Sequence, residues 1–198
     1  AARSVISPDV NLATNEIGIP QEFARTLVVK EQVCGYNHDA LVRAVLNGAH
    51  QWPGANVVCI GDRQRLDLSA KKYADRVARR AVAMRLVSRE QAVVVHRHVR
   101  DGDHVLMNRQ PTLHKPSIMA HRVRVLGTDR VLRMHYANCN VYNADFDGDE
   151  MNMHLPQDLL ATAEAAQLAA ADQQYCVPRD GAPARGLIQD HVAAGVLL

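Results

Sequence analysis

Three aspartates at alternate positions constrain the folding of this chain more than any other feature. Asp145, Asp147 and Asp149 belong to the segment 143–150, whose sequence is NADFDGDE. In an extended backbone, alternate side chains point to the same side, so the three carboxylates face one direction. Two unit charges about 4 Å apart repel by about 4 kcal/mol at an effective dielectric constant near 20. A bound divalent cation is the simplest way to offset this repulsion.

The ligand type indicates which cation would bind here. Carboxylate oxygens select Mg²⁺, Ca²⁺ or Mn²⁺ over zinc. An EF-hand also begins D-x-D-x-D, but here the glycine is Gly148 in the fourth place, and Pro156 stands in the twelfth place where a glutamate is required. The flanking apolar residues, including Phe146, favour a held loop over a solvated acidic turn. We therefore expect a magnesium site for phosphoryl-transfer chemistry, and the spacing alone does not separate a nuclease from a polymerase.

The composition indicates a folded domain. The 198 residues are 47% hydrophobic and 22% charged, with 23 Lys+Arg against 21 Asp+Glu, which excludes a disordered polyelectrolyte. No apolar run approaches the roughly 20 residues of a membrane span, so we expect no membrane contact. The four cysteines are widely spaced, which argues against a zinc site and favours reduced thiols. The chain starts at Ala1 without a methionine and stops in an apolar run, so we expect a piece of a larger protein.

The first half of the chain has the pattern of helices with one buried strand. We expect helices at 21–29 and at 39–47, the second between Asn37 and Gly48, and a strand at 56–60. The segment 71–89 carries seven basic residues and one acidic residue. It predicts a basic amphipathic helix whose apolar positions, at helical spacing, are Tyr73, Val77, Ala81 and Met84. A solvated face explains its charges more often than nucleic-acid contact does.

The second half has the pattern of short strands. The runs 92–99, 104–107, 122–126 and 131–136 are β-branched or alternating and are separated by turns, which predicts a small barrel or sandwich. Histidines in strand-like segments, such as His98 and His121, are expected to be hydrogen-bonded barrel residues rather than ligands. An alanine-rich helix is expected at 157–171, packing through Leu159, Leu160, Ala163 and Leu168.

Three motifs, which occur along the chain in the same order as in a known family, carry a resemblance to it. The sequences NADFDGD at 143–149, NRQPTLHK at 108–115 and ARSVISPDVNL at 2–12 resemble the largest subunit of multi-subunit DNA-directed RNA polymerases. The likeness covers almost the whole chain and is weakest at about 62–90. Val10 stands where the family usually has proline. The stretches HYANCNVY, DQQY and GLIQDH resemble RNA polymerase I more than polymerases II or III.

The resemblance implies a fold and a domain organisation. The class is mixed α+β, with a double-psi β-barrel that carries the acidic metal loop, and with inserted and flanking helices. Residues 1–156 would form the active-site domain with a helical insertion at about 20–90. Residues 157–198 would begin the following helical, pore-type domain.

The resemblance also implies a reaction. Asp145, Asp147 and Asp149 would be the catalytic residues that hold a tightly bound Mg²⁺, and a second Mg²⁺ would arrive with the nucleoside triphosphate. Together they would serve nucleotidyl transfer to the RNA 3′ end on a DNA template. Arg109 and Asn143 match positions that read the ribose hydroxyls, and a guanidinium and an amide can both hydrogen-bond a 2′-hydroxyl. A salt bridge from Arg109 to the acidic loop is the alternative, and both can hold at once.

Three further residues are candidates for nucleic-acid contact. Arg3 matches a position near the template strand, and His114 and Lys115 would shape or charge the pocket more than they would react. The implied partners are the second-largest subunit, the other polymerase subunits, template DNA, nascent RNA and nucleoside triphosphates. The implied location is the nucleus, in the nucleolus, with ribosomal RNA as product.

Two other functions stay open at this point. One is a non-catalytic, arginine-rich module that binds nucleic acid, since 19 of the basic residues are arginine. The other is a magnesium-dependent nuclease, which would need Lys115 or a histidine beside the cluster. The chain lacks the zinc-binding cysteines, bridge helix and trigger loop expected of the whole subunit, so we expect it to be inactive in isolation.

Overall fold

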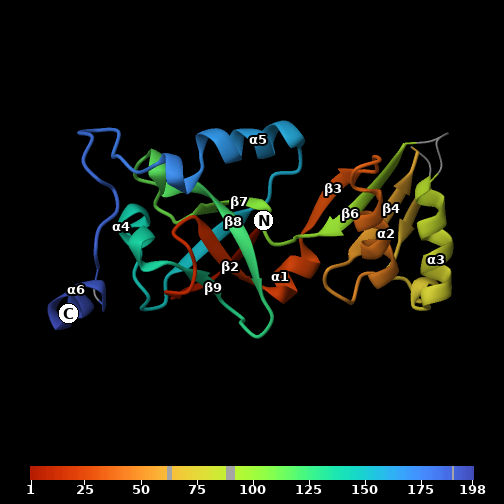
Figure 1. Cartoon of the computed structure of the whole chain (residues 1–198), viewed down its shortest axis with the longest axis horizontal. Helices are drawn as coiled ribbons and strands as arrows, with labels where there is room; N and C mark the ends of the chain where they lie inside the picture. The colour runs from red at the N-terminus through yellow and green to blue at the C-terminus, as the bar shows by residue number, and fades with distance from the viewer. Residues whose placement is uncertain (62–63, 88–91, 189) are drawn as a thin grey trace. The chain divides into compact units, whose positions relative to one another are not determined.

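A computed structural model (Figure 1) describes residues 1–61, 64–87, 92–188 and 190–198. The chain divides into two units, one formed by Ala1–Pro20 with Asp101–Leu198 and the other by Gln21–Arg100. The second unit is therefore inserted between two strands of the first.

The first unit contains a closed barrel of six strands in the order β1-β10-β7-β8-β2-β9. Two of the pairings are parallel, β1 with β9 and β2 with β8, and the other four are antiparallel. The expected mixed α+β class with a β-barrel is confirmed. The strands are β1 (Ala2–Pro8), β2 (Glu16–Pro20), β7 (His104–Asn108), β8 (Ile118–Leu126), β9 (Leu132–Met134) and β10 (Glu150–His154).

Methionine fills much of the barrel interior. Five of the six methionines are fully buried, and the sixth, Met84, belongs to the other unit. In β10 the buried residues Met151 and Met153 alternate with less buried neighbours, which is the period of a strand with one face in a core. An unbranched thioether adapts to irregular gaps, so these side chains suit the interior of a small closed barrel. The buried methionines of the barrel are Met107, Met119, Met134, Met151 and Met153.

The second unit contains a four-stranded antiparallel sheet in the order β3-β6-β4-β5. From the sequence we expected a helical insertion at about 20–90 and did not predict a sheet there. The run 92–99 was assigned to the barrel, and this assignment was wrong, because β6 pairs with β3 on one side and β4 on the other. Its elements are α1 (Gln21–Thr26), β3 (Val28–Gln32), α2 (His38–Asn47), β4 (Ala55–Ile60), β5 (Gln64–Asp67), α3 (Arg76–Met84) and β6 (Val93–His98).

Two helices of this unit differ from the prediction. The helix expected at 21–29 ends at Thr26, because the β-branched pair Val28 and Val29 joins β3 and pairs with β6. The helix expected at 71–89 is broken near Asp75, whose carboxylate accepts the Val77 N–H at 3.3 Å and starts α3. This new start changes which residues face the core, and the part of the expected helix at 88–89 lies outside the described residues.

The buried side of α3 is therefore not the one expected. Val82 and Ala83 are buried, whereas Val77 and Met84 are 72% and 70% exposed. Of the four expected apolar positions, Tyr73 alone is buried, in a 3₁₀ turn at Lys71–Tyr73. The basic residues Arg76 and Arg80 are exposed, as expected for a solvated face.

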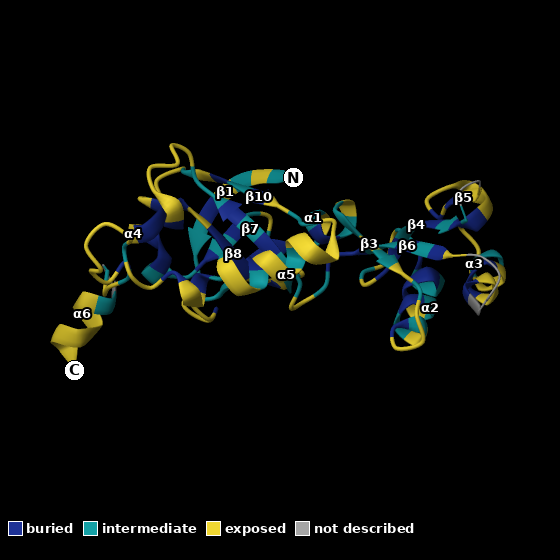
Figure 2. Cartoon of the chain, turned by 90° about the horizontal axis from the view of Figure 1, so that it is seen from above, coloured by how far each residue is buried: buried dark blue, intermediate teal, exposed yellow. Residues whose placement is uncertain are grey.

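The remaining helices belong to the same unit as the barrel. They are α4 (Cys139–Tyr142), α5 (Leu159–Leu168) and α6 (Asp190–Leu197), with α4 preceded by a 3₁₀ turn at Tyr136–Asn138. The expected helix at 157–171 is shorter, and its leucines are exposed rather than packed (Figure 2). None of the helices within the described ranges is long and apolar enough to cross a membrane.

Candidate metal centre

The three aspartates lie in a loop, residues 143–149, that joins α4 to β10 and is called the acidic loop below. Asn143 ends α4 in a left-handed conformation, with φ of 47°, which asparagine tolerates better than most residues. The Ala144 N–H donates to the Cys139 carbonyl at 2.9 Å and closes the helix end. At the other end, the Ile6 N–H of β1 donates to the Asp149 carbonyl at 3.0 Å. The loop is thus tied to a helix end and to a barrel strand.

The three carboxylates converge. One oxygen from each of Asp145, Asp147 and Asp149 lies within 4.8 Å of the other two. Asp145 and Asp147 are exposed and Asp149 is partly buried, so the group faces solvent on one side. A set of carboxylate oxygens with an open side suits a hard divalent cation that keeps places for water or substrate oxygens. The residues present therefore fit Mg²⁺.

Arg109 lies directly against the third aspartate. Its Nε donates to Asp149 Oδ2 at 2.8 Å, and both side chains are about one-fifth exposed, at 18% and 21%. The Asp145 N–H donates to the same oxygen at 3.1 Å. These donors, chiefly Arg109, hold the pKa of Asp149 below its ordinary value. Asp149 is therefore a carboxylate with its charge already compensated in part.

Asp145 is in the opposite situation. A shared hydrogen bond with Asp147, together with the negative charges of Asp147 and Asp149, raises the pKa of Asp145 above its ordinary value. A carboxyl group whose pKa is raised by neighbouring carboxylates indicates an excess of negative charge at the site. A divalent cation would remove that excess, which is a second reason that the group fits a metal.

The barrel itself brings Arg109 to this place. β7 pairs with β10 so that Asn108 lies opposite Asn152, and Arg109 directly follows β7. β10 directly follows the acidic loop, so the end of one strand delivers the arginine beside the start of its neighbour. The Gln110–Pro111 peptide bond that follows is cis.

The family model described as RNA polymerase Rpb1, domain 2, matches residues 1–171. The chain belongs to this family. It is 52% identical over 206 residues to the DNA-directed RNA polymerase I subunit rpa1 of Dictyostelium discoideum, and 51% identical over 205 residues to the DNA-directed RNA polymerase I subunit RPA190 of Saccharomyces cerevisiae. Both matches cover 100% of the chain and 12% of the relative. The chain thus spans about an eighth of the length of these curated relatives.

An archaeal relative extends the same result. The DNA-directed RNA polymerase subunit Rpo1N of Sulfolobus acidocaldarius is 45% identical over 198 residues, covering 100% of the chain and 22% of that protein. The resemblance to the largest subunit of multi-subunit RNA polymerases, with its likeness to RNA polymerase I, is confirmed.

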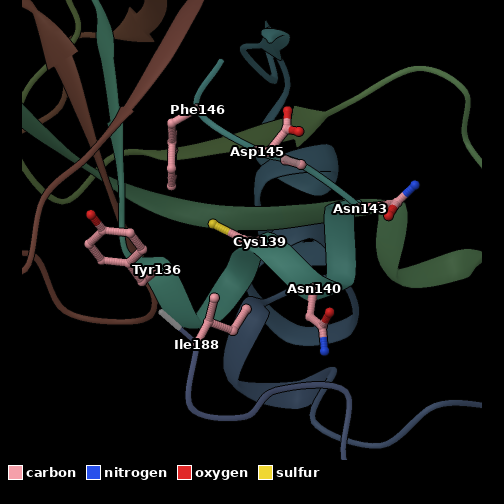
Figure 3. A pocket seen from close by; sticks show the side chains of 8 residues that line it. Tyr136, Cys139, Asn140, Asn143, Asp145, Phe146 and Ile188 are labelled. Carbon is pink, nitrogen blue, oxygen red and sulfur yellow. The ribbon is translucent and has the colours of Figure 1, made fainter. Parts of the chain in front are cut away.

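The remaining predicted residues of this Rpb1 domain lie in different surroundings. Asn143 lines a cavity of about 220 Å³ together with Asp145 (Figure 3). Arg3 donates from Nε to Glu150 Oε2 at 2.7 Å, with both side chains largely exposed. His114 and Lys115 are exposed, and neither has a hydrogen bond or ion pair to the acidic loop in the part of the chain that the structure describes.

Tyr142, one of the apolar residues that flank the loop, is fixed by a buried contact, and the partly buried Arg185 is a polar anchor that the sequence analysis missed. Tyr142 is 2% exposed, and its hydroxyl lies 2.8 Å from Nε2 of His121 on β8. Burial lowers the pKa of His121 to about 4, so this histidine is neutral and structural, as expected. Arg185 donates to the Asn138 side chain at 2.8 Å and to the Ala171 carbonyl at 2.6 Å. Arg185 is the one charged residue among the apolar and small residues at 181–188, and this was the only sequence signal that its guanidinium has a partner within the protein.

Proposed function

We propose that this chain supplies the catalytic centre of a DNA-directed RNA polymerase of the RNA polymerase I class. In this proposal, nucleotides are transferred from nucleoside triphosphates to the RNA 3′ end on a DNA template. The observation that carries it is the convergence of one oxygen from each of three aspartates within 4.8 Å. A family model that covers residues 1–171 supports the same assignment.

Asp145, Asp147 and Asp149 would hold one Mg²⁺ tightly, and a second would arrive with the incoming nucleotide. The bound ions would lower the cost of the charge that develops on the attacking and leaving oxygens. Arg109 keeps Asp149 ionised and fixes the direction of its carboxylate, since Nε donates to Oδ2 at 2.8 Å. The chain therefore contributes a rigid, charged set of ligands rather than a nucleophile.

Arg109 and Asn143 would recognise the sugar of the incoming nucleotide. A guanidinium has five N–H donors, and the bond to Asp149 uses one of them, at Nε. The other donors can reach a ribose hydroxyl without loss of the ion pair. Asn143 would add an amide at the start of the acidic loop, next to Asp145 along the surface of the cavity.

Domain limits, partners and location follow from the same proposal. Residues 1–156 would form the active-site domain and 157–198 the start of a helical domain, which agrees with the end of the last barrel strand at His154. The chain would act with the second-largest subunit and the other polymerase subunits, on template DNA and nascent RNA. It would work in the nucleus, in the nucleolus, where it would make ribosomal RNA. Arg3, His114 and Lys115 would lie near nucleic acid.

The decisive experiment replaces one carboxylate in the assembled polymerase. Asp147→Asn keeps the size of the side chain and removes one negative charge from the converging group. We expect RNA synthesis in the presence of Mg²⁺ to fall to near zero while the polymerase still assembles. Asp158→Asn is the matched control, because Asp158 is exposed and its side chain makes no cap hydrogen bond to α5. Near-normal elongation by Asp147→Asn would instead support a module that only binds nucleic acid.

The isolated chain tests the remaining alternative. We expect the 198 residues alone, given template, nucleotides, RNA and Mg²⁺, neither to extend nor to cleave RNA. Cleavage would support a nuclease. Extension would contradict the proposal that catalysis needs the other subunits.

A further inference from the structure

Phe146 stands between two of the metal-binding candidates and points to a different side from them. Its ring lies 5.5 Å from the ring of Tyr136, centroid to centroid, with an angle of 85° between the planes. Figure 3 shows Phe146 extending from the loop toward Tyr136, whereas the Asp145 carboxylate points away from both. The middle of the acidic loop is therefore attached to the turn that precedes α4.

The attachment continues into the C-terminal part of the chain. His191 of α6 meets Tyr136 edge to face, with centroids 5.7 Å apart and planes at 76°. His191 also stacks on His135, at 5.6 Å and 24°. Ile188 from the same segment lines the cavity of about 220 Å³ together with Phe146 and Tyr136. A row of rings thus runs from α6 through Tyr136 to the acidic loop.

The loop needs such a restraint because the negative charges of its three aspartates repel one another. Among the three aspartates, Asp149 accepts hydrogen bonds from two donors, since the Arg109 Nε and the Asp145 N–H both bind its Oδ2. Asp147 has no cationic partner among the described residues. An edge-to-face ring pair stabilises its arrangement beyond the burial of its area. Placed at the residue between Asp145 and Asp147, that contact restrains the backbone from which both carboxylates project.

We propose that Phe146 and Tyr136 are positioning residues for the metal, and that His191 braces them, so that the segment after the barrel sets the affinity of the acidic loop for a divalent cation. None of the three touches the metal or the substrate. The proposal rests on the proposed function, since it presumes that the three aspartates bind a cation. It predicts that removal of an aromatic ring lowers the metal affinity even when the charge of the site is unchanged.

The test measures metal binding directly on the assembled polymerase. Mn²⁺ is the probe, and its bound fraction is followed by electron paramagnetic resonance. The relevant site is defined as the Mn²⁺ binding that wild type shows and Asp147→Asn lacks. Tyr136→Leu removes the ring, and Tyr136→Phe keeps it. We expect the midpoint of Mn²⁺ binding to rise about 3- to 10-fold in Tyr136→Leu and to stay within about 2-fold of wild type in Tyr136→Phe.

A second pair of variants lies outside the barrel and keeps the test independent of barrel folding. His191→Ala is expected to raise the midpoint of Mn²⁺ binding, as Tyr136→Leu does. His191→Phe keeps a ring at this position and is expected to have a midpoint close to that of wild type. Unchanged midpoints in both Tyr136→Leu and His191→Ala would overturn the positioning role while leaving the metal site intact. Equal Mn²⁺ binding by wild type and Asp147→Asn would instead overturn the proposed function, and the inference with it.

Discussion

Arg109 and Asp149 are joined by a 2.8 Å hydrogen bond although 40 residues separate them in the sequence. The bond connects the NRQP segment to the last aspartate of the acidic loop, because adjacent barrel strands end and begin at the same place. It also lowers the pKa of Asp149, which favours the ionised form of this carboxyl group. In the proposed function, this one arginine therefore supports a metal ligand and keeps further donors for the nucleotide.

The ribose role of Arg109 predicts a loss of sugar discrimination. Arg109→Ala in the assembled polymerase removes the donors that can reach a 2′-hydroxyl. A hydrogen bond to a charged group contributes about 1.5 to 3 kcal/mol, so the preference for ribonucleotides over deoxyribonucleotides is expected to fall about 10- to 100-fold. The measurement is the ratio of kcat/KM for the two nucleotides, in which a general loss of metal affinity cancels.

Arg3→Ala is the control for this ratio. Arg3 is also bound to a carboxylate next to the acidic loop, through Glu150, but unlike Arg109 its side chain is largely exposed. Its loss is expected to leave the ratio unchanged. An unchanged ratio in Arg109→Ala as well would restrict Arg109 to its ion pair with Asp149.

His98 predicts a loss of stability in acid. Its Nδ1 accepts the Gly54 N–H at 3.1 Å, so Nε2 carries the proton and donates to Asn56 Oδ1 at 2.8 Å. Burial, with the nearby charges of Arg25 and Arg100, lowers the pKa of His98 from 6.5 to about 4. The unfolded chain therefore binds a proton that the folded chain does not. The free energy of unfolding is expected to fall as the pH drops from 6.5 toward 4, by up to about 1.4 kcal/mol per pH unit from this group.

The measurement is urea unfolding of the 198-residue chain at several pH values across this range. His98→Asn is expected to be less stable at pH 7 and to show a shallower dependence on pH. His121, whose pKa burial also lowers to about 4, supplies part of the slope that remains. His50→Asn is the control, since His50 is exposed and lies outside the contacts of His98 with Gly54 and Asn56. An equal slope in His98→Asn and wild type would contradict the assignment.

The sequence was most informative where local geometry decides the outcome. Alternate positions in an extended segment put three carboxylates on one side, and their charges then required a cation or a strong restraint. The short runs at 104–107 and 122–126 were correctly predicted as strands of a small barrel or sandwich, and both lie in the barrel. The run at 92–99 has the same texture, yet it lies in the other sheet. β-propensity reports that a residue suits a pleated surface, and it does not identify the partner strand.

The misassigned helix faces have a similar cause. The side chain of Asp75 sets the start of α3, and a shift of one or two residues in the start rotates which side chains meet the core. Leu159 and Leu160 of α5 are exposed, although apolar leucine side chains favour burial. The ring contacts among Phe146, Tyr136 and His191 join three separate segments, so no spacing along the chain indicates them.

Gly54 predicts a severe loss of stability on the smallest possible substitution. It is buried directly before β4, where its N–H donates to His98 Nδ1 and its carbonyl accepts the His98 N–H at 2.9 Å. A Cβ at this position would lie 2.0 Å from the Gly48 carbonyl oxygen and 2.4 Å from that of Gln51. Both obstacles are main-chain atoms, which cannot rotate away as a side chain can.

Gly54→Ala is therefore expected to lower the free energy of unfolding in urea by at least the roughly 1 to 3 kcal/mol typical of overpacking. Gly35→Ala in the same unit is the matched control, because a Cβ there meets nothing within 4 Å and the residue is exposed. Equal midpoints for the two variants would show that the turn before β4 can open without loss.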